Sequence, residues 1–122
     1  MIKKILENMT AKARAERRDE LYRSFKRREA KVGGQVFGPV PEGVRREFFC
    51  LDKHTWIWHE EWTDQNGQRQ VRTTRYDVRP NSILKAQDNQ PYQVVTPKEA
   101  YRLFQAVQLY KDRVRQEVYS FI

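Results

Sequence analysis

The first quarter of the chain has the hydrophobic spacing of an amphipathic helix. From about Ile2 to Lys31 it contains no Gly or Pro and is rich in Ala, Arg, Lys, Glu and Leu, which are good helix formers. Its apolar side chains recur at three- and four-residue steps in two zones, first Ile2, Ile5, Leu6, Met9 and Ala13, then Leu21, Tyr22 and Phe25. The pattern predicts one long helix with two separate apolar contact zones.

A segment rich in Gly and Pro, residues 33–43, ends this helix. It holds four of the five glycines, and its two prolines, Pro39 and Pro41, would each remove a helical hydrogen bond. A P-loop is excluded, because that motif requires Gly-Lys-Ser or Gly-Lys-Thr before a helix. A dinucleotide-binding fingerprint is excluded too, because no strand precedes the glycines. We therefore predict a loop that carries the chain from a helix to a sheet.

The middle of the chain, from Val44 to about Gln87, has the alternating pattern of β-strands. The hydrophobic period changes to two there, and the residues become aromatic and β-branched. Three strands are predicted, near residues 45–51, 55–63 and 69–78. Weaker strand signals follow at residues 82–86 and 92–95.

The hairpin between the second and third strands carries Asn66-Gly67, which favours a two-residue type I′ loop. The resulting register pairs Trp62 with Val71, Glu61 with Arg72, Trp58 with Arg75 and Trp56 with Asp77. One face of the sheet is then predicted to carry Trp56, Trp58, Trp62, Phe49, Leu51 and Val71. The opposite face is predicted to carry Phe48, Cys50, Ile57, His59 and Tyr76. We favour a core under a helix for the Trp-rich face; a stacking platform for sugars or bases is the alternative.

A second helix is predicted at the carboxy-terminal end. Thr96 is the expected N-cap, Pro97 occupies the first helical position and Glu99 completes a capping box. The apolar stripe of this helix comprises Ala100, Leu103, Phe104, Val107, Tyr110, Val114 and Val118. Such a stripe needs a sheet to cover.

These elements predict an α+β fold. We expect a three- to five-stranded antiparallel sheet with a long basic amino-terminal helix and a long amphipathic carboxy-terminal helix packed on it. Residues 1–32 form a basic helical extension, and residues 33–122 form a single α+β domain. Within that domain the loop covers 33–43, the sheet about 44–95 and the helix about 97–119. A length of 122 residues fits one domain.

Composition sets the broad class of the protein. With 33% charged residues, no stretch approaches the ~20 consecutive apolar residues of a membrane span. No secretory signal follows Lys3 and Lys4, because Glu7 and Asn8 interrupt the apolar residues. Cys50 is the one cysteine and cannot form an internal disulfide, which agrees with a reducing compartment. We expect a cytoplasmic protein.

The basic charge is concentrated in the amino-terminal helix. The net charge is +8, and residues 1–31 hold eleven Lys or Arg against five Asp or Glu. A dense cationic helix neutralises phosphates and releases counterions, which gives salt-sensitive binding with little sequence specificity. We predict a partner that is RNA or a ribonucleoprotein. The predicted nucleic-acid-binding residues are Arg14, Arg17, Arg18, Arg23, Lys26, Arg27, Arg28, Lys31, Arg45 and Arg46.

Other interpretations of the same features stay open. The basic face is a solvated surface, or it binds an acidic protein surface. A protein-interaction module, including a homodimer, would dock through the amino-terminal helix or the apolar Phe121-Ile122 tail. A third reading is a small-ligand or enzymatic domain with a pocket near Trp58, His59 and Cys50.

Catalytic and metal-binding signals are weak. His59-Glu60-Glu61 lacks the second His of a zincin, and Glu60 and Glu61 point to opposite faces of a strand. Two His and one Cys make a protein-only zinc site improbable. In one register Cys50 would lie beside His59 as a nucleophile pair, but a small buried thiol is the favoured reading. We predict a non-enzymatic protein without cofactor or metal.

Overall fold

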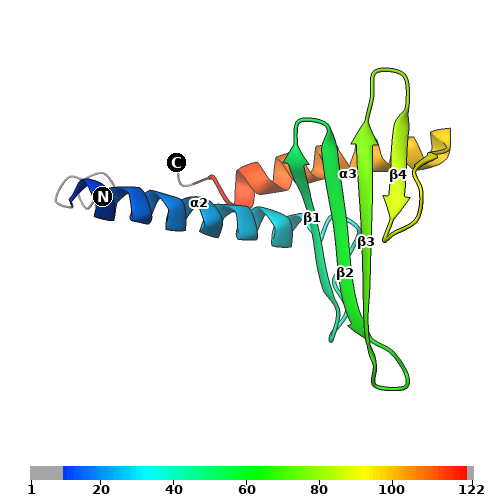
Figure 1. Ribbon diagram of the computed structural model, residues 1–122, viewed down its shortest axis with the longest axis horizontal. Helices are drawn as coiled ribbons and strands as arrows, with labels where there is room; N and C mark the ends of the chain where they lie inside the picture. The colour runs from blue at the N-terminus through cyan, green and yellow to red at the C-terminus, as the bar shows by residue number, and fades with distance from the viewer. Residues whose placement is uncertain (1–9, 121–122) are drawn as a thin grey trace.

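The computed structural model describes residues 10–120 and has an α+β fold (Figure 1). The elements in chain order are helix α2 (Ala11–Gly33), strands β1 (Arg45–Asp52), β2 (Thr55–Thr63), β3 (Arg69–Val78), β4 (Ile83–Gln87) and β5 (Gln93–Val94), and helix α3 (Pro97–Glu117). The strands form one antiparallel sheet in the order β1-β2-β3-β4-β5. The predicted fold class is confirmed. Residues 2–9 of the predicted helix and the Phe121-Ile122 tail lie outside the described residues.

The hydrophobic core lies between α3 and one face of the sheet. Its buried side chains are Phe48, Trp56, Tyr76, Leu103, Ala106, Tyr110, Val114 and Val118. Aromatic rings fill the centre, where Phe48 stacks on Trp56 at 5.1 Å between centroids and Tyr110 meets both rings edge-on. The prediction that the Trp-rich face packs under the carboxy-terminal helix is confirmed for Trp56.

The stripe of α3 that covers the sheet differs from the predicted one at a single large residue. Phe104 was expected in the stripe, but its side chain is 60% exposed. Successive residues of a helix are turned by about 100°, and Leu103 already occupies the position that faces the sheet. The small Ala106 is buried instead.

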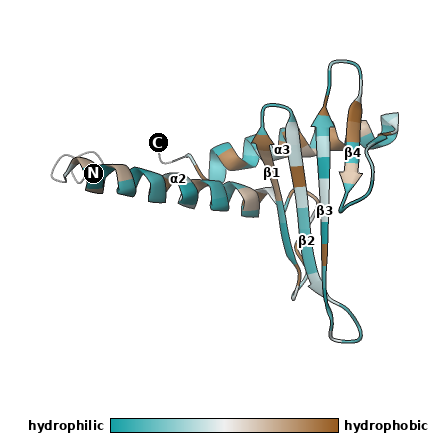
Figure 2. Cartoon of the chain, viewed as in Figure 1, coloured by the Kyte–Doolittle hydropathy of each residue, from teal (hydrophilic) through white to brown (hydrophobic). Residues whose placement is uncertain are grey.

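Helix α2 docks at one end and projects at the other. Its last turns lie against β1 and α3, where Phe25 and Val32 pack on the core and buried Glu29 accepts a hydrogen bond from the Tyr119 hydroxyl. Residues 10–20 are exposed or half-buried, and this part of the helix extends away from the sheet (Figure 1). Figure 2 shows that the helix is mainly hydrophilic along this length. The cations of α2 therefore lie on a helix whose carboxy-terminal end is packed against the sheet and whose amino-terminal part projects from it.

The β2–β3 register differs by one residue from the predicted one. Trp58 faces Thr74, Glu61 faces Val71 and Trp62 faces Gln70. The cause is the hairpin loop. It has three residues, 65–67, and backbone hydrogen bonds of Asp64 with Gln68 and Gly67 close it.

Asp64 sets the length of this loop. Its Oδ1 accepts hydrogen bonds from the backbone N–H groups of Asn66 and Gln68, both at 2.9 Å. Gly67 has φ +76°, whereas Asn66 does not have the positive φ that a type I′ turn requires. Three-residue hairpins use this arrangement, with a type I turn followed by a left-handed residue.

The observed registers of β1–β2 and β2–β3 correct the predicted faces of the sheet, because a one-residue slip moves side chains to the other face. Phe48, Cys50 and Tyr76 share the core face with the three Trp residues, whereas Phe49 and Val71 lie on the opposite face. Leu51 stands at an irregularity of β1, between Cys50 and Asp52, where the register shifts. Helix α3 lies behind the sheet in Figure 1, and α2 meets it at the β1 edge. Within residues 10–120, no helix lies over the opposite face (Figure 1).

The start of α3 is tied to the sheet. Thr96 is the N-cap as predicted, and its hydroxyl accepts from the Glu99 N–H at 3.2 Å. The Glu99 carboxylate does not complete the predicted capping box. It accepts instead from the Tyr76 hydroxyl at 3.0 Å and from Lys85 Nζ at 2.8 Å. Burial and this carboxylate raise the pKa of Tyr76.

Candidate nucleic-acid interface

Two of the predicted nucleic-acid-binding segments come together in the fold. The end of α2 lies beside the start of β1, and a groove of about 480 Å³ separates them. This basic groove is lined by Arg27, Lys31, Gln35, Val40, Val44, Arg45, Arg46 and Glu47. Four of the ten predicted cations therefore surround one concavity, although residues 32–44 separate Lys31 from Arg45 in the sequence.

The cations of the basic groove differ in how far they are already paired. Among the described residues, Arg27 and Lys31 have no carboxylate partner, and both are exposed. Arg45 reaches Glu47 at 3.2 Å and Glu61 at 3.6 Å, yet its side chain stays 63% exposed. These three side chains present positive charge to solvent.

Arg46 has a different role. Its Nε lies 2.8 Å from Glu60 Oε2, and only 14% of its side chain is exposed. The pair joins β1 to β2 on the core face, where the two residues face each other in the register. Arg46 therefore supports the wall of the groove, and its charge is balanced within the protein.

A row of cations along α2 leads into the basic groove. Arg23, Arg27 and Lys31 follow at four-residue steps, which places their side chains along one ridge of the helix. Residues 23 and 31 are about 12 Å apart along the axis. We call these three residues the basic ridge.

The other predicted cations of α2 are distributed around the helix. Arg17 pairs with Glu20 at 3.3 Å, Lys26 pairs with Glu29 at 3.2 Å, and Arg28 donates to the Glu117 carbonyl oxygen at 3.3 Å. Within the part of the chain that the structure describes, no ion pair is formed by Arg14 or Arg18. The structure thus separates the ten predicted residues into a convergent set near β1 and a set dispersed around the rest of α2.

The alternative site near Trp58, His59 and Cys50 is not assembled. Cys50 is paired with Trp56 in the register and lies on the core face. His59 is paired with Glu47 and lies on the other face of the sheet. The two side chains point to opposite sides of the sheet, so the hypothesis of a Cys–His nucleophile pair is wrong. The β1–β2 register decides this, because it pairs Cys50 with Trp56 and not with a residue on the face of His59.

His59 belongs to a hydrogen-bonded cluster that the sequence reading missed. Its Nδ1 lies 2.8 Å from Thr73 Oγ1 and its Nε2 lies 2.8 Å from Glu61 Oε2. The hydrogen bond to His59, with the nearby cations Arg69 and Arg45, lowers the pKa of Glu61. Strand alternation does place His59 and Glu61 on one face, but finding Thr73 opposite His59 needs the correct register. The cluster lies on the face of the sheet opposite the core, and its hydrogen bonds fix the positions of these polar side chains.

The described range contains neither a cluster of metal-ligand side chains nor a membrane-spanning helix. Among residues 10–120, no group of three or more His, Cys, Asp or Glu side chains is placed to hold a metal ion. In the same range, no helix is both long and apolar enough to span a membrane.

Comparisons of this chain with protein-family models, with curated proteins and with solved structures find no significant match. Function must therefore be inferred from the residues and their arrangement.

Proposed function

We propose that this protein is a non-enzymatic binding protein that contacts the phosphate backbone of RNA, alone or within a ribonucleoprotein. The contact surface is the basic ridge of α2 together with Arg45. The observation that supports this proposal is the convergence of Arg27, Lys31 and Arg45 on one groove, where Glu47 is the single carboxylate in the lining. Solvent-exposed cations around a concavity favour a polyanion.

Binding follows from the placement of these charges. A phosphate between Arg27 and Arg45 gains charge-assisted hydrogen bonds from two guanidinium groups, and each replaced counterion adds entropy. The ridge extends this contact along the helix. Because these groups read phosphates and not base edges, we expect little dependence on sequence.

The test compares a charge-reversed ridge with an equal reversal elsewhere. Binding of single- and double-stranded RNA and DNA is measured by fluorescence anisotropy at about 50 and 200 mM salt. The double variant Arg27→Glu with Lys31→Glu should lose RNA binding. The control, Lys53→Glu with Lys111→Glu, has the same net charge but changes exposed cations outside the ridge and the groove.

The proposal predicts tight binding at low salt that weakens steeply at high salt, is lost in the ridge variant and is largely retained in the control. Equal losses in both variants would show that net charge alone drives binding, and this would overturn the assigned surface. No binding by the unaltered protein at low salt would overturn the RNA proposal and would make an acidic protein surface the partner to seek.

A further inference from the structure

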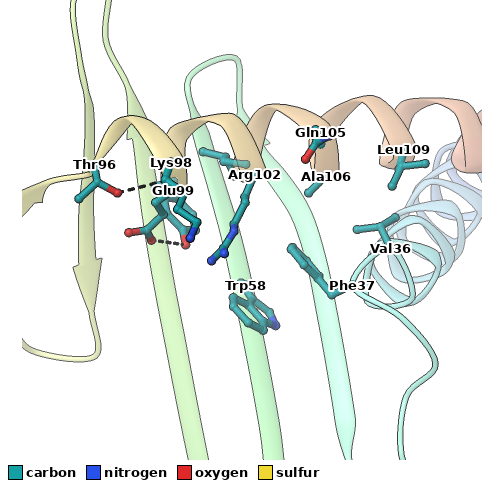
Figure 3. Close-up of a pocket in the computed structure, with 12 residues that line it drawn as sticks. Val36, Phe37, Trp58, Thr96, Lys98, Glu99, Arg102, Gln105, Ala106 and Leu109 are labelled. Carbon is teal, nitrogen blue, oxygen red and sulfur yellow. Dashed lines mark hydrogen bonds between the residues drawn. The ribbon is translucent and has the colours of Figure 1, made fainter.

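A second groove lies on the other side of the loop that follows α2. It has a volume of about 550 Å³ and runs between the first half of α3 and the core face of β2 (Figure 3). Phe37 and Trp58 supply aromatic surface, Leu109 supplies aliphatic surface, and Lys98 and Arg102 supply positive charge. We call it the aromatic groove. Its volume is within the range of small-molecule sites.

The aromatic surface is a preformed stack. The Phe37 ring lies 4.8 Å from the Trp58 ring between centroids with an interplanar angle of 13°. An edge contact with buried Phe48, at 5.1 Å and 87°, fixes the Phe37 ring from another side. Phe37 nevertheless stays 39% exposed. Part of the Phe37 residue in this preformed stack is therefore accessible to a ligand.

The charge of the aromatic groove favours an anion. Arg102 extends from α3 toward Trp58 in Figure 3, and neither it nor Lys98 forms an ion pair with any residue between 10 and 120. Glu99 is the one carboxylate in the lining, and it already accepts hydrogen bonds from Lys85 and Tyr76. The groove therefore has a surplus of positive charge next to a ring stack.

The two grooves share the same loop. Gln35 and Val40 line the basic groove, whereas Val36 and Phe37 line the aromatic groove. Arg113 of α3 holds the loop in place by donating a hydrogen bond to Gln35 Oε1 at 2.8 Å. A strand of nucleic acid that crosses this loop meets phosphate-binding cations on one side and a ring stack on the other.

We propose that the aromatic groove binds one unpaired nucleotide, with its base stacked on Phe37 and its phosphate held by Arg102 and Lys98. This inference rests on the proposed function and adds a preference to it. A base in a duplex has its faces covered by its neighbours and cannot enter the groove, whereas a base in a single strand can. The protein should therefore bind single-stranded RNA more tightly than a duplex.

The first experiment measures this preference in groove variants. Phe37→Leu removes the ring, and Arg102→Gln removes the charge while keeping hydrogen-bonding capacity. The controls are Phe104→Leu and Arg115→Gln, which change the same residue types at exposed positions of α3 outside the groove. Thermal unfolding of each variant checks that the fold is retained.

Stacking on an aromatic side chain predicts a loss of about tenfold in affinity for single-stranded RNA in Phe37→Leu. Duplex affinity should not change, and both controls should bind like the unaltered protein. A variant that keeps its full affinity for single-stranded RNA, or that loses single-stranded and duplex binding equally, would overturn the inference and leave the ridge proposal standing.

The second experiment separates the groove from the ridge by using adenosine 5′-monophosphate as the probe. The indole N–H signal of Trp58, assigned through Trp58→Phe, is followed by NMR, with inorganic phosphate as the control ligand. A shift that persists in the Arg27→Glu, Lys31→Glu variant and disappears in Phe37→Leu supports the groove. If the mononucleotide shifts Trp58 but the protein binds no RNA, the groove binds a free nucleotide, and the RNA proposal fails. If neither ligand shifts Trp58, the groove inference fails.

Discussion

Gly33 of α2 lies directly against the backbone of Phe48 in β1. A β-carbon at residue 33 would come within 1.8 Å of the Phe48 carbonyl oxygen and 2.9 Å of the Tyr110 ring. The next residue has the same relationship, because a β-carbon on Gly34 would lie 2.0 Å from the Arg46 carbonyl oxygen. Neither glycine has a positive φ, so space and not backbone conformation requires glycine here. These two residues bring the basic end of α2 onto the sheet.

The first prediction is that Gly33→Ala destabilises the protein by about 2 kcal/mol, as overpacking of a core does. Alanine is the better helix former by about 1 kcal/mol, so a stabilised variant would show that the close contact does not matter. Urea unfolding followed by Trp fluorescence measures the difference. Gly38→Ala is the comparison, because its β-carbon meets no atom within 4 Å and only the positive φ of 109° opposes it. Its loss should be smaller, about 1 kcal/mol.

The sequence predicts the elements of this fold well, and the physical reasons are local. Spacing of apolar residues and the Thr96-Pro97 cap are properties of a few neighbouring residues, and they place α3 and the three long strands correctly. The register is harder to predict because Asn66-Gly67 marks the turn but not its length. The length of the loop depends on which backbone N–H groups donate hydrogen bonds to the Asp64 side chain.

The second prediction tests this role of Asp64. Asp64→Ala removes the acceptor for two backbone N–H groups and for Gln70 Nε2, so the unfolding midpoint should fall. Asp64→Asn keeps one carbonyl acceptor and should lose less. An unchanged midpoint for Asp64→Ala would mean that the loop holds its length without this side chain.

The hydrogen bonds of Asp64 also predict that the free energy of unfolding depends on pH in the acid range. The hydrogen bond from Gln68 N–H, followed by that from Gln70, lowers the pKa of Asp64 in the folded state. A depressed pKa stabilises the fold above the unfolded value of about 4, and this contribution is lost as the pH falls through the folded pKa. The free energy of unfolding, measured from neutral pH downward, should therefore fall less steeply in Asp64→Asn than in the unaltered protein.

The third prediction compares two phenylalanines that the hydrophobic pattern alone does not distinguish. Phe48 is fully buried and Phe104 is 60% exposed. Phe48→Ala should cost about 3–5 kcal/mol, whereas Phe104→Ala should change stability by less than about 0.5 kcal/mol. Because Phe48→Ala is expected to leave little folded protein, Phe48→Leu supplies a measurable intermediate. Similar losses at both positions would contradict the assigned face of α3.

The candidate interface was predictable as a list of residues but not as a surface. The charge pattern of the sequence is enough to identify the cations of the amino-terminal helix. The convergence of Lys31 with Arg45 depends on how closely Gly33 and Gly34 let α2 approach β1, which is a tertiary contact. The aromatic groove depends likewise on the loop that folds Phe37 back onto Trp58.

The fourth prediction concerns the junction between α2 and the end of α3. Burial and the hydrogen bond to Glu29 raise the pKa of Tyr119 to about 12. A raised pKa stabilises the fold below the unfolded value of about 10, and this contribution is lost as the pH rises from about 10 to 12.

Tyr119→Phe should therefore be less stable than the unaltered protein at neutral pH and should lose less stability on going to alkaline pH. Tyr76 and Tyr110, whose pKa values are also raised mainly by burial, remain in the variant and keep part of the slope. Denaturant unfolding at a series of alkaline pH values provides the measurement. Parallel pH profiles for the two proteins would contradict the role of the Tyr119–Glu29 hydrogen bond.

The last prediction separates two arginines of the basic groove by what each already binds. Arg27 has no carboxylate partner within residues 10–120, whereas Arg46 is held by Glu60 at 2.8 Å. If the ridge binds phosphates, Arg27→Gln should reduce the slope of log affinity against log salt by about 1 and leave stability nearly unchanged. Arg46→Gln should leave the salt slope unchanged but lower stability by about 2 kcal/mol, because Glu60 loses a charged hydrogen-bond partner. Anisotropy titrations at several salt concentrations and urea unfolding of both variants give the two values. The reverse outcome, a salt slope that depends on Arg46 and not on Arg27, would mean that the ion pair opens on binding and that the phosphates enter the groove from the sheet side.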